Sequence, residues 1–148
     1  MSLKMNSILL CESNMQRNKS MTEILMKNFP DCNIISTSIF GKAIDETKLN
    51  FNEISVILIS DELSYRVVHD DRKDVYSYNF FINDYSFFPN RAWELAENLR
   101  IIKGFNSKII YCGSKKIIPS IKEYVFNEIF YDPHLNNMEG IIKSIKNL

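Results

Sequence analysis

The stretch SVILIS, residues 55–60, is the part of the sequence that decides the fold class. The side chains from Val56 to Ile59 are all aliphatic, so a strand formed here would be apolar on both alternating faces. Such a strand needs cover on both faces, which the central strands of a parallel sheet receive from helices. The stretch therefore predicts a central parallel strand in an α/β domain.

Further strand-like and helix-like runs alternate on both sides of this stretch. Short β-rich runs bounded by polar or turn residues predict four more strands, at residues 7–11, 33–36, 108–112 and 128–131. Apolar residues at helical spacing predict helices at residues 15–29, 41–49, 91–103, 117–126 and 138–145. The order predicts one domain, residues 1–148, with a doubly wound five-stranded parallel sheet of flavodoxin-like type.

Composition narrows the range of functions. A hydrophobic content of 45% and a charged content of 24% are typical of a soluble globular protein. The formal net charge is zero, whereas nucleic-acid binders usually carry a basic excess, so we expect no direct nucleic-acid binding. No apolar run approaches the length of a membrane span, and we expect no membrane association.

The cysteines indicate a reducing environment. There are three, Cys11, Cys32 and Cys112, widely spaced and without a CxxC pair. An odd number at such spacings predicts neither a disulfide framework nor a zinc site. Together with the lack of a recognisable signal peptide, this predicts a cytoplasmic protein.

A long insertion separates the third strand from the next helix, at about residues 62–90. Connections of this kind usually span about 2–6 residues, so the length invites a functional interpretation. The insertion begins with charged residues and then becomes aromatic, which suits either a flap on the sheet edge or a partner or dimer surface. The candidate interface residues are its aromatic side chains: Tyr76, Tyr78, Phe80, Phe81, Tyr85, Phe87 and Phe88.

Four separate pieces of the sequence carry a family resemblance. They are SILLCESN at residues 7–14, GKAI at 41–44, the strand at 55–60, and FYDPHL at 130–135 followed by Met138 and Ile141-Ile142. In this order and spacing the chain resembles the CheY-like receiver domain of two-component response regulators over nearly its whole length outside the insertion. The resemblance implies the flavodoxin-like fold and a role in signal transduction.

The resemblance also implies a phosphorylation pocket, and this chain departs from it. In receivers that transfer phosphate, an aspartate accepts the phosphoryl group, an acidic pair holds magnesium, and a lysine and a hydroxyl residue neutralise the phosphoryl oxygens. Carried over by position, the acceptor becomes Ser60 and the lysine becomes Asp132. The acidic pair becomes Glu12 and Ser13, and the hydroxyl position becomes Gly113 with Ser114 beside it.

These departures predict a degenerate receiver that has lost phosphorylation and needs no cofactor. Ser60 cannot form an acyl phosphate, and Asp132 would repel an incoming phosphoryl group. A second possibility keeps the reaction: with a register shift of one residue, Asp61 would be the acceptor, and Mg²⁺ would then be required. Asp61 is therefore included in the predicted pocket.

An enzyme alternative starts from Cys11 and Arg17, which are separated by five residues directly after a predicted strand. This spacing is similar to the phosphate loop of low-molecular-weight protein tyrosine phosphatases, in which a thiolate attacks phosphorus and arginine binds the oxyanion. Asp132 before Pro133 is similar to that family's general acid. In the competing interpretation, Cys11 is a buried strand end and Arg17 lies on the exposed face of the first helix.

The interpretation that the sequence favours is a receiver-like regulatory domain that is not an enzyme and acts through protein–protein interaction. The expected partner is another protein or a second copy of the chain. Two surfaces are candidates: the aromatic insertion, and the face formed by the fourth and fifth helices, which the receiver family uses.

Overall fold

The computed structural model describes residues 6–61, 63, 92–114 and 125–148. Their strands and helices follow one another in the order β1(Ser7–Glu12), α1(Met15–Asn28), β2(Asn33–Thr37), α2(Phe40–Asn50), β3(Ile54–Ser60), α3(Ala92–Arg100), β4(Lys108–Tyr111), β5(Glu128–Ile129) and α4(Met138–Lys146). Within the described residues, no helix is both long and apolar enough to cross a bilayer.

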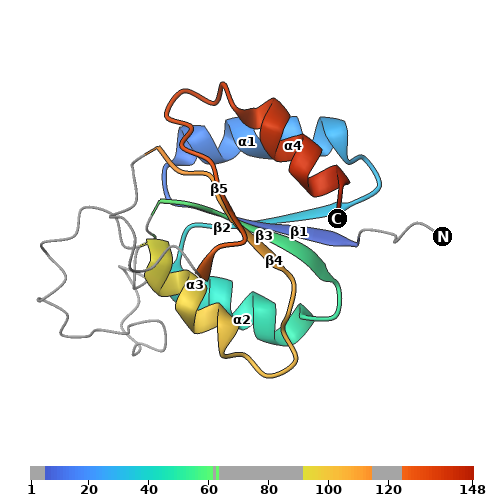
Figure 1. The fold of residues 1–148 in the computed structure, drawn as a ribbon, viewed down its shortest axis with the longest axis vertical. Coiled ribbons are helices and arrows are strands. Elements are labelled where there is room, and N and C mark those ends of the chain that lie inside the picture. The colour runs from blue at the N-terminus through green and yellow to red at the C-terminus, as the bar shows by residue number, and fades with distance from the viewer. Residues whose placement is uncertain (1–5, 62, 64–91, 115–124) are drawn as a thin grey trace, which may run out of the picture.

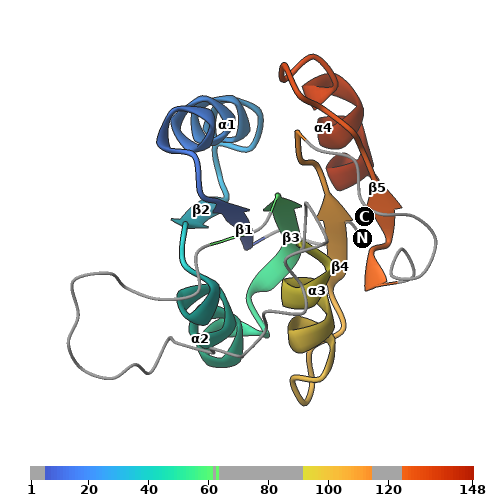
Figure 2. The same ribbon diagram turned by 90° about the vertical axis from the view of Figure 1, so that its left-hand side faces the viewer.

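The five strands form one parallel sheet in the order β2-β1-β3-β4-β5. Helices α1 and α4 cover one face of the sheet, and α2 and α3 cover the other (Figures 1 and 2). This is the doubly wound, flavodoxin-like arrangement predicted from the sequence, and it is confirmed. The strand order reverses between β1 and β3, so ligands of such sheets bind at the carboxyl ends of these two strands.

Two apolar cores lie on the two faces of the sheet. Along β1 the side chains alternate: Leu9 and Cys11 pack in the core beneath α2 and α3, while Ile8 and Leu10 pack in the core beneath α1 and α4. The alternation follows from the pleat of a strand, which points successive side chains to opposite faces. Because both faces are covered, the strand is buried from end to end.

Helix α1 begins at the carboxyl edge of the sheet because its first turn is capped locally. Asn14 is the N-cap residue, and its side-chain Oδ1 accepts a hydrogen bond from the Arg17 backbone N–H at 2.8 Å. Such a cap satisfies one of the backbone donors that a helix leaves unpaired at its start. The cap therefore fixes the first turn of α1 beside the ends of the strands.

Several predicted boundaries need correction. β5 ends at Ile129 and not at residue 131, because the chain then turns towards α4. α3 ends at Arg100, three residues before the predicted end, since residues 101–104 form turns. The predicted helix 117–126 falls mostly outside the described residues, and Val125 and Phe126 at its end are not α-helical. The aromatic insertion, residues 62–90, lies outside the described residues apart from Leu63 near its start.

Candidate functional site

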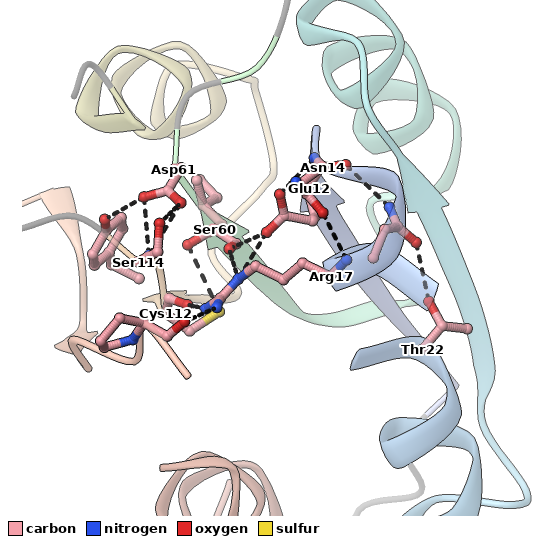
Figure 3. Close-up of polar contacts among 12 residues, drawn as sticks. Glu12, Asn14, Arg17, Thr22, Ser60, Asp61, Cys112 and Ser114 are labelled. Atoms are coloured by element: carbon pink, nitrogen blue, oxygen red, sulfur yellow. Dashed lines mark hydrogen bonds and ion pairs between the residues drawn. The ribbon is translucent and has the colours of Figure 1, made fainter. Parts of the chain in front are cut away.

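The candidate site lies at the carboxyl edge of the sheet, where the ends of β1, β3 and β4 meet. Register pairing places Glu12, the last residue of β1, beside Ser60, the last residue of β3. The fold thus brings two residues of the predicted pocket together at the point where the strand order reverses. Figure 3 shows their side chains facing one another.

Glu12 is a buried carboxylate, with a side chain that is only 1% exposed. Its Oε1 accepts a hydrogen bond from the Ser60 hydroxyl, and its Oε2 accepts one from the Asn14 backbone N–H at 2.7 Å. Burial raises the pKa of Glu12 above the usual range of a glutamate, and the hydrogen bonds and the Arg17 charge offset this only in part. Both carboxylate oxygens are therefore engaged inside the protein.

Arg17 is the counter-charge of Glu12. Its Nε lies 3.0 Å from Glu12 Oε1 and donates a hydrogen bond to Ser60 Oγ, also at 3.0 Å. Nη2 donates to the Cys112 carbonyl at 2.7 Å, and Nη1 donates to the Pro133 carbonyl at 3.4 Å. One side chain from α1 thus contacts β1, β3, the end of β4 and the connection between β5 and α4 (Figure 3).

The position of Arg17 corrects the interpretation that places it on the exposed face of the first helix. Its side chain is only 10% exposed. Arg17 is the third residue of α1, so its long side chain reaches over the edge of the sheet and not into solvent. Helical periodicity alone did not indicate this, because the acceptors of its guanidinium come from distant parts of the chain.

Asp61 lies one residue beyond β3 and points away from Glu12, towards the end of β4. Its Oδ1 accepts a hydrogen bond from the Tyr111 hydroxyl at 2.9 Å, and its Oδ2 accepts one from the Ser114 hydroxyl at 2.6 Å. The Ser114 backbone N–H also lies 3.0 and 3.1 Å from the two oxygens. Asp61 has a φ of +62°, a left-handed conformation that aspartate adopts more readily than most residues.

Gly113 leaves room for the hydrogen bonds among Asp61, Tyr111 and Ser114. A Cβ at Gly113 would lie 2.2 Å from the Tyr111 hydroxyl oxygen and 2.4 Å from Asp61 Oδ1. Both distances are far inside van der Waals contact, so the two hydrogen-bonded groups occupy the space that a side chain would need. Gly113, at the predicted hydroxyl position, must therefore lack a side chain for Tyr111 and Asp61 to keep their places.

Asp132 is fully buried beside the end of β4. Its backbone N–H donates to the Gly113 carbonyl at 2.8 Å, and its Oδ1 accepts from the Asn137 backbone N–H, also at 2.8 Å. The carboxylate thereby closes the turn that leads into α4. No hydrogen-bond donor among the described residues reaches its Oδ2.

A polar cleft of about 390 Å³ opens above Arg17. Its walls come from the first turns of α1, the ends of β3 and β4, and the connection before α4. They are formed by Asn14, Gln16, Arg17, Ser20, Asp61, Ser114, Pro133, His134 and Leu135. Ser13 is exposed and instead lines a neighbouring hollow with Lys19 and Lys42.

The thiol that the phosphatase alternative requires is inaccessible. Cys11 lies within β1, is 0% exposed and packs in the core beneath α2 and α3. Burial, together with the Glu12 charge, raises the pKa of its thiol well above the usual range, whereas a catalytic cysteine needs a lowered pKa. The backbone N–H of Asn14, which could face an oxyanion, donates to Glu12. The geometry does not support a phosphate loop.

The residues at this edge also do not fit a magnesium ion. Mg²⁺ requires several oxygen ligands in near-octahedral geometry. Of the predicted acidic pair, Ser13 is neutral and turned to the neighbouring hollow, and Glu12 is bound by Arg17, Ser60 and Asn14. Among the residues that the structure describes, no group of three or more acidic, histidine or cysteine side chains is placed to hold a metal ion.

Comparisons with solved structures place this architecture among receiver domains. A CheY-like receiver domain from Methylobacillus flagellatus matches with a TM-score of 0.63 at 14% identity, covering 96% of this chain and 99% of that one. The chain has the receiver fold. A DNA-binding response regulator of the LuxR family from Staphylococcus aureus matches with a TM-score of 0.64 at 15% identity, covering 96% and 97% of the two chains.

A third match is the receiver domain of a histidine kinase from Arabidopsis thaliana, with a TM-score of 0.62, 10% identity, and coverage of 99% and 93%. No protein-family model and no curated protein matches the sequence. The receiver resemblance predicted from the sequence is thus confirmed at the level of the fold. At these identities, the chemistry of the site rests on this chain's own residues.

Proposed function

We propose that this receiver-like domain has lost aspartyl phosphorylation and acts as a regulatory domain through protein–protein interaction. The observation that carries the proposal is the Glu12–Arg17–Ser60 cluster, an internal ion pair among residues that the resemblance assigns to the phosphorylation pocket. A hydroxyl cannot form an acyl phosphate, and the Ser60 hydroxyl donates a hydrogen bond to the carboxylate of Glu12, which is already paired with Arg17. Ser60 is therefore not suited as the nucleophile of this reaction.

Asp61 is a poor substitute for the acceptor. Its carboxylate accepts hydrogen bonds from Tyr111 and Ser114, and its backbone is left-handed, so it faces away from Glu12. Attack on a phosphodonor would require Asp61 to give up these bonds. It would also place a phosphoryl group near the buried carboxylate of Asp132, where receivers carry a lysine.

A binding role also agrees with side chains that remain exposed near β5. Ile129, the last residue of the edge strand β5, is 42% exposed, and Tyr131, two residues further along the chain, is 45% exposed. The sequence predicts the face of the fourth and fifth helices as a candidate surface, and α4, the fifth of these predicted helices, is the part of that face that the structure describes. We propose that a protein partner or a second copy of the chain binds here or at the aromatic insertion.

Sedimentation tests the binding role for self-association. The intact chain, a variant with residues 64–88 replaced by a short linker, and the double variant Ile129→Glu/Tyr131→Glu are compared at several concentrations. We expect one of the two variants to sediment as a smaller species than the intact chain. Ile101→Glu serves as the control because Ile101 is 80% exposed on the other side of the sheet, after α3. A monomer in all samples would count against self-association.

A further inference from the structure

The oxygens around Arg17 form a cation site that the chain fills with its own side chain. Four acceptors surround the guanidinium: a carboxylate oxygen of Glu12, the hydroxyl of Ser60, and the carbonyls of Cys112 and Pro133. They come from four separate segments of the chain. The pocket sits where a magnesium ion is implied by the receiver resemblance, and its residues do not fit that ion.

The arrangement of the four acceptors favours a guanidinium over other cations. Nε donates to Ser60 and is ion-paired with Glu12, while Nη2 and Nη1 donate to the carbonyls of two other segments. A planar group with several N–H donors matches such a divided set of acceptors, whereas an ammonium presents a single compact charge. The burial of Glu12, 1% exposed, makes its charge costly unless a cation stays in place.

We propose that Arg17 is a tethered ligand of a guanidinium-binding site, and that it locks the four segments in one arrangement without any dissociable ion. This inference rests on the proposed loss of phosphorylation, because a site occupied by Arg17 leaves no room for a metal-dependent cycle. Tethering gives the guanidinium a high effective concentration, so the site stays filled. Regulation of the domain would then require a partner that withdraws Arg17, and not a change in metal or phosphate.

Chemical rescue tests the proposal. The variant Arg17→Ala leaves Glu12 buried without its counter-charge, and we expect its Tm to fall by about 6–20 °C. Methylguanidinium should raise the Tm of Arg17→Ala, with a rise that grows with the logarithm of its concentration. It should not raise the Tm of the wild-type protein, nor that of Lys19→Ala, which removes an exposed cation from the same helix.

Two further samples connect the rescue to this site. Methylammonium should rescue Arg17→Ala less well than methylguanidinium, because it lacks the planar donor set. In the double variant Glu12→Gln/Arg17→Ala the preference for methylguanidinium should disappear. Equal rescue of Arg17→Ala by both cations, or a preference for methylguanidinium that survives the loss of the Glu12 charge, would overturn the proposal.

A measurement on the wild-type protein covers the case in which Arg17→Ala does not fold. In ¹⁵N-resolved NMR spectra, the Nε–H of Arg17 should exchange with water far more slowly than that of free arginine, because the side chain is only 10% exposed and Nε donates to Ser60 and is ion-paired with Glu12. Addition of Mg²⁺ should leave this signal unchanged. Fast exchange, or loss of the signal on Mg²⁺ addition, would refute the tethered ligand. Intact mass after incubation with a small phosphodonor and Mg²⁺ tests the proposed loss of phosphorylation, and its outcome is independent of both results.

Discussion

Replacing Gly113 by alanine should destabilise the domain more than any ordinary surface substitution. The added Cβ would lie 2.2 Å from the hydroxyl oxygen of Tyr111 and 2.4 Å from Oδ1 of Asp61, so one of these groups must move. Tyr111 is 0% exposed and its ring packs against Phe126 with the ring centroids 5.5 Å apart, which leaves it little freedom. The displaced hydroxyl loses its hydrogen bond, and the crowded core is strained.

We expect the cost to be about 2–5 kcal/mol of unfolding free energy, from overpacking and from loss of the hydrogen bond between Tyr111 and Asp61. The assay is urea unfolding followed by the fluorescence of Trp93, the single tryptophan of the chain. Gly140→Ala is the matched control, because Gly140 lies in α4 and, among the residues that the structure describes, its Cβ would meet Phe130 alone, at 3.4 Å. That control should gain up to about 1 kcal/mol, since alanine favours a helix.

A free energy of unfolding for Gly113→Ala within about 0.5 kcal/mol of the wild-type value would refute this expectation, because that is the range of neutral surface substitutions. A large loss of unfolding free energy in Gly140→Ala would also count against the expectation, because both glycines would then respond alike despite their different surroundings. Equal m-values in all three proteins are required for the comparison, since a changed m-value indicates a changed denatured or native state.

Two further predictions concern titratable groups. Because burial raises the pKa of Glu12 in the folded state, its contribution to stability is present below about pH 4.3, its unfolded pKa, and is lost as the pH rises through the folded value. The unfolding free energy of the wild-type protein relative to Glu12→Gln should therefore decline from acid towards neutral pH, and a difference that rises with pH would contradict this. For the thiols, Cys32 should react with a thiol reagent in the native protein while Cys11 and Cys112, both 0% exposed, react only after unfolding. Intact mass counts the modified thiols, and rapid native labelling of Cys11 would reopen the phosphatase interpretation.

The sequence predicts the fold well because burial leaves a direct pattern in it. β1 and β3 are covered on both faces, so their apolar runs are continuous, and the strand limits predicted from them differ from the structure by one residue at most. β5 is less well predicted because it is a short edge strand whose end is set by the turn that follows, where Asp132 binds the Asn137 backbone.

The site was predicted only in part because its contacts join residues far apart in the chain. Ser60 and Glu12 could be placed together, since parallel strands end at the same edge of the sheet. The role of Arg17 could not be predicted, because its length and its position in the first turn of α1 matter only when the distant carbonyls of Cys112 and Pro133 are in place. Likewise, the apolar run that contains Tyr111 predicts a buried ring but not the partner of its hydroxyl.

The loss of phosphorylation is tested most directly by intact mass after incubation with a small phosphodonor and Mg²⁺. A receiver domain known to accept phosphate is treated in parallel as a positive control, which shows that the phosphodonor is active under these conditions. We predict no phosphoryl adduct on this chain, because Ser60 cannot form an acyl phosphate and Asp61 is bound by Tyr111 and Ser114. A stoichiometric adduct that is absent in Asp61→Asn would contradict the account and identify Asp61 as the acceptor.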